Sequence, residues 1–510
     1  METNKQKVRG RRLATALAAI VGFAALLAGC SSATNEGASP KPGGGAAASP
    51  AAATAPAATV SPKPAELKPV QLVWYLRQAK PQNDQAVIQK FNEMVKAKIN
   101  ATVEFKFLNP GDYDDKMKLV MSSGEAYDLA FTASWSNNFA NNVSKGAYLP
   151  LDAYIEQYPA IKNMYTPQIW EALKTNGKTY GIPNLQIMAT GQGIAFQSEI
   201  VKQHGIDLGK VKSLEDLTPI LQKVKDNNPG VYPARNGNIA LTTFNKYYPS
   251  VAGFMIDPAT MTVMADYDSQ MKPRYDLMRE WNQKGFFPPD VATLKNEDEL
   301  LKAGKIFAMF RRSKPGTEAE WKAKYGRDFM QLDTGTPTIN QAAVLSTVTA
   351  VSQTSKNPDR AVMLYNLLLT DKEIYNVLVN GIEGQDYTKL SANRIEPKKD
   401  GYTILNWEIA SVFNSYLIPG QADDVWEQTR KLNDSSIIDP LVSFNFNPAP
   451  VQSELAQINA ANSEFNPILL NGMADVATTL KQKTDKMKAA GVDKVIAEIN
   501  KQLAEWKTKK

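Results

Sequence analysis

VQLVWYL at residues 70–76 opens a regular alternation of strands and helices in this sequence. This apolar run predicts a buried strand, and QNDQAVIQKFNEMVKAKI (82–99) places its apolar residues at helical spacing. ATVEFKF (101–107) then alternates with a period of two, as a strand with one wet face does. A second helical stretch, DYDDKMKLVMSSGEA (112–126), leads to the apolar YDLAF (127–131). This order predicts an open, mostly parallel α/β sheet.

The N-terminal thirty residues predict an export signal. Five cations between Lys5 and Arg12 precede the uncharged apolar run LATALAAIVGFAALLAG (13–29), which is shorter than the roughly 20 residues a spanning helix needs. The run ends in Leu27-Ala28-Gly29-Cys30, which resembles the lipobox of bacterial lipoproteins. We therefore expect residues 1–29 to be a lipoprotein signal peptide and Cys30 to carry the lipid. An ordinary secretory signal that ends at a cysteine by accident is the alternative.

The cysteine content and the net charge exclude disulfide bonds within the chain and argue against a nucleic-acid-binding protein. Cys30 is the only cysteine, so no disulfide can form within the chain. The whole chain has 58 Lys and Arg against 52 Asp and Glu; residues 1–29 hold five of these cations and one acid, which leaves 53 against 51 after processing. A net charge of +2 lacks the basic surplus of a nucleic-acid-binding protein. We therefore expect no nucleic-acid partner.

The rest of the chain divides into a tether and a body. Residues 30–66 begin with Cys30, the expected lipidation site, and consist mainly of Ala, Pro, Gly, Ser and Thr. Such a segment cannot bury enough apolar surface to fold, so the composition predicts a flexible tether. Residues 67–510 form a body long enough for two lobes. Helical periodicity recurs at 359–369, and again over 475–506 with a break at Gly491.

Two short motifs carry a resemblance to a known family. NGKTYGIP (176–183) resembles the "GKxYGIP" segment of family 1 extracellular solute-binding proteins, where the chain first crosses between lobes, here near 181–185. YDLAF (127–131) is similar to a strand of that family that ends at the ligand cleft.

Other segments resemble the narrower group of LipO-like lipoproteins of Gram-positive bacteria. They are TSKNPDRA (354–361), NGIEG (380–384), FNFNPAPVQSEL (444–455) and AAGVDKVIAEINKQLAEW (489–506). The resemblance implies a C-terminal region of unknown function over about 380–510.

The resemblance implies both a fold and a role. The fold is α/β, of the two-lobed periplasmic-binding-protein type (class II), with open, mostly parallel sheets flanked by helices and a hinged cleft between the lobes. The implied role is capture of a small solute, usually a saccharide or oligosaccharide, by hinge closure and its delivery to the membrane subunits of an ABC permease. The protein would be a monomer on the outer face of the cell membrane, held there by its lipid anchor.

The number and spacing of the relevant residues argue against several kinds of catalytic and metal site. His204 is the only histidine and precedes a glycine at an expected helix end, which excludes zinc sites built on His and Cys and favours a helix cap over a catalytic base. Gly177-Lys178-Thr179 lacks the P-loop's first glycine, because residue 172 is alanine. An EF-hand loop from Asp266 would need Gly at 271 and Glu at 277, which are Met and Leu. We expect no cofactor and no catalytic site, with a structural calcium ion at an acidic cluster as the open alternative.

Aromatic and polar residues near expected strand ends are the candidate ligand contacts. Flat rings bury the C–H patches of sugars, while Asn and Arg hydrogen-bond to hydroxyl groups. Ligands of α/β sheets lie beyond the carboxyl ends of the strands. The candidate ligand-binding residues are Trp74, Tyr75, Arg77, Trp135, Asn184 and Arg311. A packing role in the core is the alternative for each aromatic residue, and the tryptophans at 281, 321, 407, 426 and 506 are assigned to core packing.

Two other functions remain open from the sequence. One is a carbohydrate-active lipoprotein enzyme on a similar scaffold, which would consume an oligosaccharide instead of holding it. The other is a ligand-sensing lipoprotein that presents its closed form to a membrane receptor.

Overall fold

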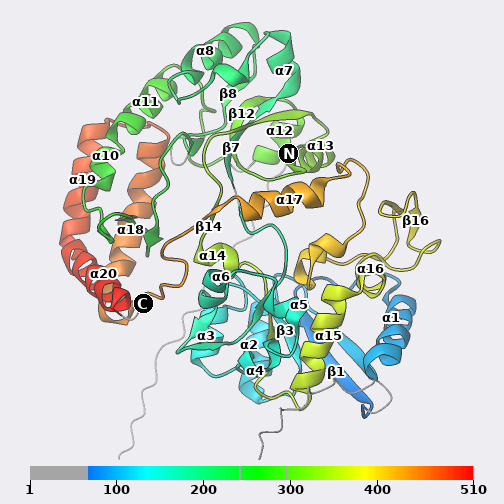
Figure 1. Cartoon of the computed structure of the whole chain (residues 1–510). Coiled ribbons are helices and arrows are strands. Elements are labelled where there is room, and N and C mark those ends of the chain that lie inside the picture. The colour runs from blue at the N-terminus through cyan, green and yellow to red at the C-terminus, as the bar shows by residue number, and fades with distance from the viewer. Residues whose placement is uncertain (1–66, 190, 240–242, 295, 509–510) are drawn as a thin grey trace, which may run out of the picture. The chain divides into compact units, whose positions relative to one another are not determined.

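The computed structural model describes residues 67–189, 191–239, 243–294 and 296–508 (Figure 1). The predicted signal peptide, the lipidation at Cys30 and most of the tether lie outside these residues. The described residues belong to one compact unit. Among the described residues, no helix combines the length and the apolar composition needed to cross a membrane.

The first lobe is built on a five-stranded sheet in the order β2-β1-β3-β15-β6. Its strands are β1 (Val70–Leu76), β2 (Ala101–Phe107), β3 (Leu129–Thr132), β6 (Ile182–Pro183) and β15 (Val348–Val351). The helices α1 (Asp84–Ile99), α2 (Tyr113–Ser123), α15 (Pro358–Thr370) and α16 (Lys372–Asn380) belong to the same lobe. The predicted strand–helix alternation at the start of the body is therefore confirmed.

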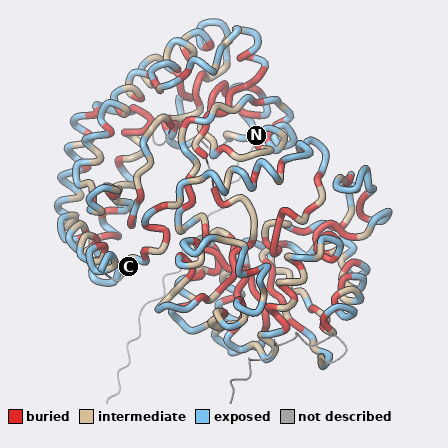
Figure 2. The backbone as a smooth tube through the Cα atoms, in the orientation of Figure 1, coloured by how far each residue is buried: buried red, intermediate tan, exposed pale blue. Residues whose placement is uncertain are grey.

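The core of this lobe forms because α1, α15 and α16 turn apolar faces toward the sheet. Val87, Phe91 and Val95 of α1 are fully buried at spacings of four residues, and they pack in one cluster with Leu72 and Leu364. Figure 2 shows this concentration of buried backbone around the strands.

The second lobe is built on a four-stranded sheet in the order β13-β7-β12-β8. Its strands are β7 (Gly191–Gln197), β8 (Tyr232–Ala234), β12 (Ile306–Ser313) and β13 (Phe329–Asp333). The accompanying helices are α7 (Ser198–Gln203), α8 (Leu217–Asn227), α11 (Lys272–Gln283), α12 (Glu297–Lys302) and α13 (Thr317–Tyr325). The chain leaves the first sheet after β6 and enters the second at β7.

The two-lobed α/β class is confirmed, but the expectation of mostly parallel sheets is wrong in detail. In the first sheet β1 pairs in parallel with β2 and β3, while β15 is antiparallel to both β3 and β6. In the second sheet only β12 and β8 are parallel. In the first sheet, β15 is antiparallel because the chain returns to it from the other lobe. It therefore enters the sheet at the edge where β1 and β3 end and runs in the opposite direction.

Three helices lie at the end of the C-terminal region predicted over about 380–510: α18 (Gln452–Leu470), α19 (Val476–Ala489) and α20 (Val492–Lys507). The break predicted at Gly491 is present, with this glycine at φ 83°. The helices α18 and α19 pack against α11 of the second lobe. Lys483 of α19 is almost fully buried, and its ammonium lies 2.6 Å from a carboxylate oxygen of Asp268.

Candidate functional site: an aromatic cluster at a sheet edge

The carboxyl ends of β1 and β3 bring two predicted residues together. The strands pair in parallel with Trp74 opposite Leu129, so Arg77 after β1 and Trp135 after β3 lie at one edge of the sheet. The guanidinium carbon of Arg77 lies 4.6 Å from the centroid of the Trp135 ring. A cation at this distance interacts favourably with the electron-rich face of the indole.

Trp135 is exposed, yet its position is fixed. Its side chain is 51% exposed, an unusual state for the largest apolar residue. The indole N–H donates to the backbone oxygen of Ser346 at 2.8 Å. The backbone N–H of the preceding residue, Ser134, donates to the backbone oxygen of Leu345 at 2.7 Å. The ring also lies 5.9 Å from that of Phe131. These contacts hold a flat apolar side chain in place while about half of the residue stays exposed.

Trp407 extends this surface and was missed by the sequence reasoning. It lies in the 3-10 helix Asn406–Glu408, half-buried, with its ring centroid 6.3 Å from that of Trp135 and 5.8 Å from that of Phe131. We call Phe131, Trp135 and Trp407 the aromatic cluster. No local pattern marks Trp407, since only the tertiary fold brings it to residues near 131–135.

Glu408 lies beside the cluster and is fully buried. One carboxyl oxygen accepts the backbone N–H of Arg77 at 3.0 Å, whereas the other has no hydrogen-bond partner among the described residues. Burial raises the pKa of Glu408 from its ordinary value of 4.5 to about 8, although Arg77 acts in the opposite direction. Glu408 is therefore mainly protonated at neutral pH.

Three predicted residues lie in the interior instead. Trp74 is fully buried and packs on Phe105 at 5.8 Å between ring centroids. Tyr75 faces the other side of the sheet, almost fully buried, and its hydroxyl donates to Glu125 at 2.7 Å. Asn184 is also buried.

Asn184 joins the crossover segment to three other elements. Its amide N–H donates to the backbone oxygen of Trp407 at 3.2 Å, while its amide oxygen accepts from the hydroxyls of Thr349 at 3.0 Å and Tyr365 at 3.3 Å. These contacts tie the exit from the first lobe to β15, α15 and the segment that carries Trp407.

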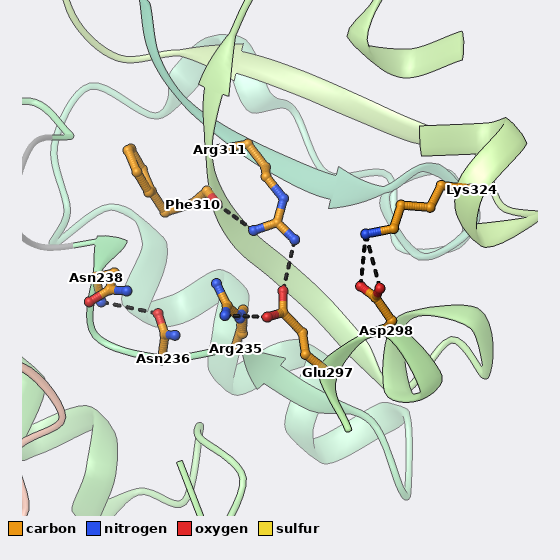
Figure 3. A network of polar contacts seen from close by, with 8 residues as sticks. All are labelled: Arg235, Asn236, Asn238, Glu297, Asp298, Phe310, Arg311 and Lys324. Atoms are coloured by element: carbon orange, nitrogen blue, oxygen red, sulfur yellow. Dashed lines mark hydrogen bonds and ion pairs between the residues drawn. The ribbon is translucent and has the colours of Figure 1, made fainter. Parts of the chain in front are cut away.

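Arg311 belongs to a separate polar network on the second sheet (Figure 3). Because β8 and β12 run in parallel, Arg235 after β8 and Arg311 near the end of β12 lie at the same edge. Both guanidinium groups form ion pairs with Glu297, and the Arg311 contact measures 2.8 Å. Burial lowers the pKa of Arg235, an effect that Glu297 opposes. The structure thus pairs Arg77 with Trp135 and places Arg311 elsewhere.

The acidic clusters and the histidine have structural partners. Asp114 accepts from the hydroxyl of Ser136 at 2.6 Å and from the backbone of Asn137 at 2.9 Å. His204 follows α7 and contacts Asn228 at 2.7 Å. Within the described parts of the chain, no group of three or more His, Cys, Asp or Glu side chains is placed to hold a metal ion.

The profile of the bacterial extracellular solute-binding protein family matches residues 79–374, more than half of the chain. The chain belongs to this family. A second profile, a domain of unknown function (DUF3502), matches residues 440–508 of the solute-binding protein, which comprise α18, α19 and α20.

The solute-binding protein has relatives among proteins of Gram-positive bacteria. It is 28% identical over 450 residues to a carbohydrate ABC transporter substrate-binding protein of Streptococcus pneumoniae, covering 84% of this chain and 89% of that one. It is 24% identical over 127 residues to lipoprotein LipO of Bacillus subtilis, covering 25% of this chain and 24% of that one.

A solved structure is similar over most of the chain. The N-glycan transport solute-binding protein of Streptococcus pneumoniae matches with a TM-score of 0.76 at 26% identity, covering 87% of this chain and 100% of that one. Its complex with Man5GlcNAc matches with a TM-score of 0.60 at the same identity and coverage.

Proposed function

We propose that this solute-binding protein captures an uncharged oligosaccharide on the aromatic cluster and passes it to an ABC permease. The observation that carries the proposal is the half-exposed ring of Trp135, fixed by its N–H bond to Ser346 beside Arg77 and Trp407. Rings held in this way bury the C–H faces of a pyranose, while a nearby guanidinium donates to hydroxyl groups. The Streptococcus pneumoniae relatives support a saccharide cargo, and Man5GlcNAc is the first probe.

Capture is proposed to proceed by hinge closure. The chain crosses between the two sheets at the β6–β7 connection and again between β13 and β15, and such paired crossings suit a hinge. Ligand favours the closed form because only that form contacts it from both lobes. Small-angle scattering should show compaction of the full chain with bound oligosaccharide, and an unchanged radius of gyration would contradict closure.

The cellular setting is part of the proposal. Cys30 would be lipidated and hold the protein on the outer face of the membrane, with residues 31–66 as the tether and the permease subunits as the partner. The LipO relative and the lipobox-like LAGC support this.

A thermal-shift panel tests the cargo class. It would compare Man5GlcNAc, the mannosyl-N-acetylglucosamine disaccharide at its reducing end, uronate oligomers and short peptides. A ligand at 100 times its dissociation constant stabilises the folded state by about 2.7 kcal/mol, a rise of a few degrees for a chain of this size. Stabilisation by Man5GlcNAc, with the glycan recovered intact, is expected; stabilisation by peptides alone would refute a saccharide cargo.

A further inference from the structure

A cavity of about 580 Å³ lies beyond the carboxyl end of β8, apart from the aromatic cluster. Its walls come from residues 235–238, from residues 291–294 and from α18 of the C-terminal region. The volume falls within the range of about 300–1,000 Å³ that is typical of small-molecule sites. The polar residues used below are Arg235, Asn236, Asn238, Asn459, Asn462 and Asn466.

Three asparagines form one face of α18 toward this cavity. Asn459, Asn462 and Asn466 follow one another at spacings of three and four residues, which places them on the same side of a helix. Their side-chain amides make no hydrogen bond to another described residue, and the amide oxygen of Asn466 is buried without a partner. Helix interiors disfavour asparagine relative to alanine, so α18 forms despite this row.

The facing wall carries further unused donors. Asn236 and Asn238 lie together after β8, with the backbone N–H of Asn238 donating to the Asn236 side-chain oxygen at 3.2 Å (Figure 3). The Nε of Arg235 is buried and has no hydrogen-bond partner in the described structure, although its terminal nitrogen pairs with Glu297. The cavity is therefore lined on two sides by groups able to hydrogen-bond to a ligand.

The walls are held together tightly. Gly237 packs against the carbonyl of Leu470, where a Cβ atom would collide with the backbone oxygen. Its N–H donates to the side-chain oxygen of Asn471 at 3.0 Å, and Asn282 of α11 donates to the Asn471 backbone oxygen at 2.8 Å. These contacts fix the end of α18 against the second lobe, so the asparagine row is presented by a rigid element.

The chemistry of the lining identifies the ligand class. Each amide offers two donors and one acceptor, which matches neighbouring hydroxyl groups that both donate and accept. No carboxylate is among the described lining residues, and the charge of Arg235 is already engaged by Glu297. Val291 and Leu294 add apolar surface suited to the C–H faces of a ring.

We propose that this cavity is a second saccharide subsite, in which α18 of the C-terminal region binds the outer residues of an uncharged oligosaccharide. The inference rests on the proposed function and assigns a binding role to the C-terminal helices. A glycan that occupies the aromatic cluster alone would leave this subsite empty, so the asparagine row would favour longer ligands.

The test compares two probes on matched variants of the full chain by isothermal titration calorimetry. The double variant Asn459→Ala, Asn462→Ala removes two amides from the row, and alanine at these accessible helical positions preserves folding. Gln457→Ala is the control, an exposed amide on the same helix outside the cavity. We expect the double variant to bind Man5GlcNAc about tenfold more weakly and the reducing-end disaccharide within about twofold of wild type.

The possible failures are distinguishable. Undiminished affinity of the double variant for Man5GlcNAc, or equal losses for both probes, would overturn the subsite and leave the proposed function standing. Failure of the wild-type protein to bind either probe would overturn the proposed function and the subsite together.

Discussion

Replacing Glu408 by glutamine should remove the loss of stability between pH 4 and pH 8 that this one carboxyl group causes. The carboxyl group is fully buried beside Arg77, and its pKa rises from 4.5 to about 8 because burial disfavours the charge. In the unfolded chain the group ionises near its ordinary pKa. The folded state thus binds a proton that the unfolded state releases, so stability is fully present below about pH 4.5 and lost as pH rises through about 8.

The magnitude follows from these two pKa values. Between pH 4 and pH 6 the folded state loses about 2 kcal/mol relative to the unfolded chain, and it loses about 2 kcal/mol more between pH 6 and pH 8. Above about pH 9 this contribution is constant. Glutamine has nearly the same shape and keeps an acceptor for the Arg77 N–H, but it cannot ionise.

Urea unfolding of wild type and Glu408→Gln at pH 4, 6, 8 and 9 measures the effect. The difference in unfolding free energy between variant and wild type should grow by about 4 kcal/mol from pH 4 to pH 8 and then stay level. Glu505→Gln, on an exposed side chain of α20, is the matched control and should run parallel to wild type. A difference between Glu408→Gln and wild type that does not change with pH would refute the assignment of a neutral buried carboxyl group.

Three further predictions concern the site and its supports. Trp135→Ala should weaken Man5GlcNAc binding roughly tenfold to a hundredfold in calorimetry, since it removes the stacking surface, while the melting temperature changes little because half of the ring is already exposed. Asn184→Ala should lower the unfolding free energy by about 1–3 kcal/mol in urea, because Thr349 and the Trp407 carbonyl lose a buried partner. Gly237→Ala should lower the melting temperature, because its Cβ would displace the Leu470 carbonyl from the second lobe.

Each of these has a contradicting outcome. Unchanged glycan affinity in Trp135→Ala would remove the aromatic cluster from the site. A fully stable Asn184→Ala would mean that the crossover segment is held by other contacts, and a wild-type melting temperature in Gly237→Ala would mean that the loop and α18 can separate freely.

The local sequence pattern was sufficient to predict the first helix and strands of the body. Helical periodicity over 82–99 and strand alternation over 101–107 correspond to α1 and β2 within two residues, because these segments bury faces that repeat at 3.6 and 2 residues. The direction of β15 was not predictable in this way. Its pairing with β3 depends on a return of the chain from the other lobe, more than 200 residues later.

The candidate site was predictable only in part. Arg77 and Trp135 follow strands whose carboxyl ends share an edge, so position along the chain sufficed to bring them together. Trp74 and Tyr75 lie before the end of β1, and alternation along the strand turns their side chains into the cores on its two faces. Trp407 and Glu408 lie in a 3-10 turn with no periodicity, and they reach the site through contacts distant in sequence.

The most direct test of oligosaccharide capture is calorimetric titration of Man5GlcNAc into the full chain, with mass analysis of the recovered glycan. We expect saturable binding of one glycan per chain and recovery of the glycan unchanged. Absence of binding, or recovery of a shortened glycan, would contradict capture for transport.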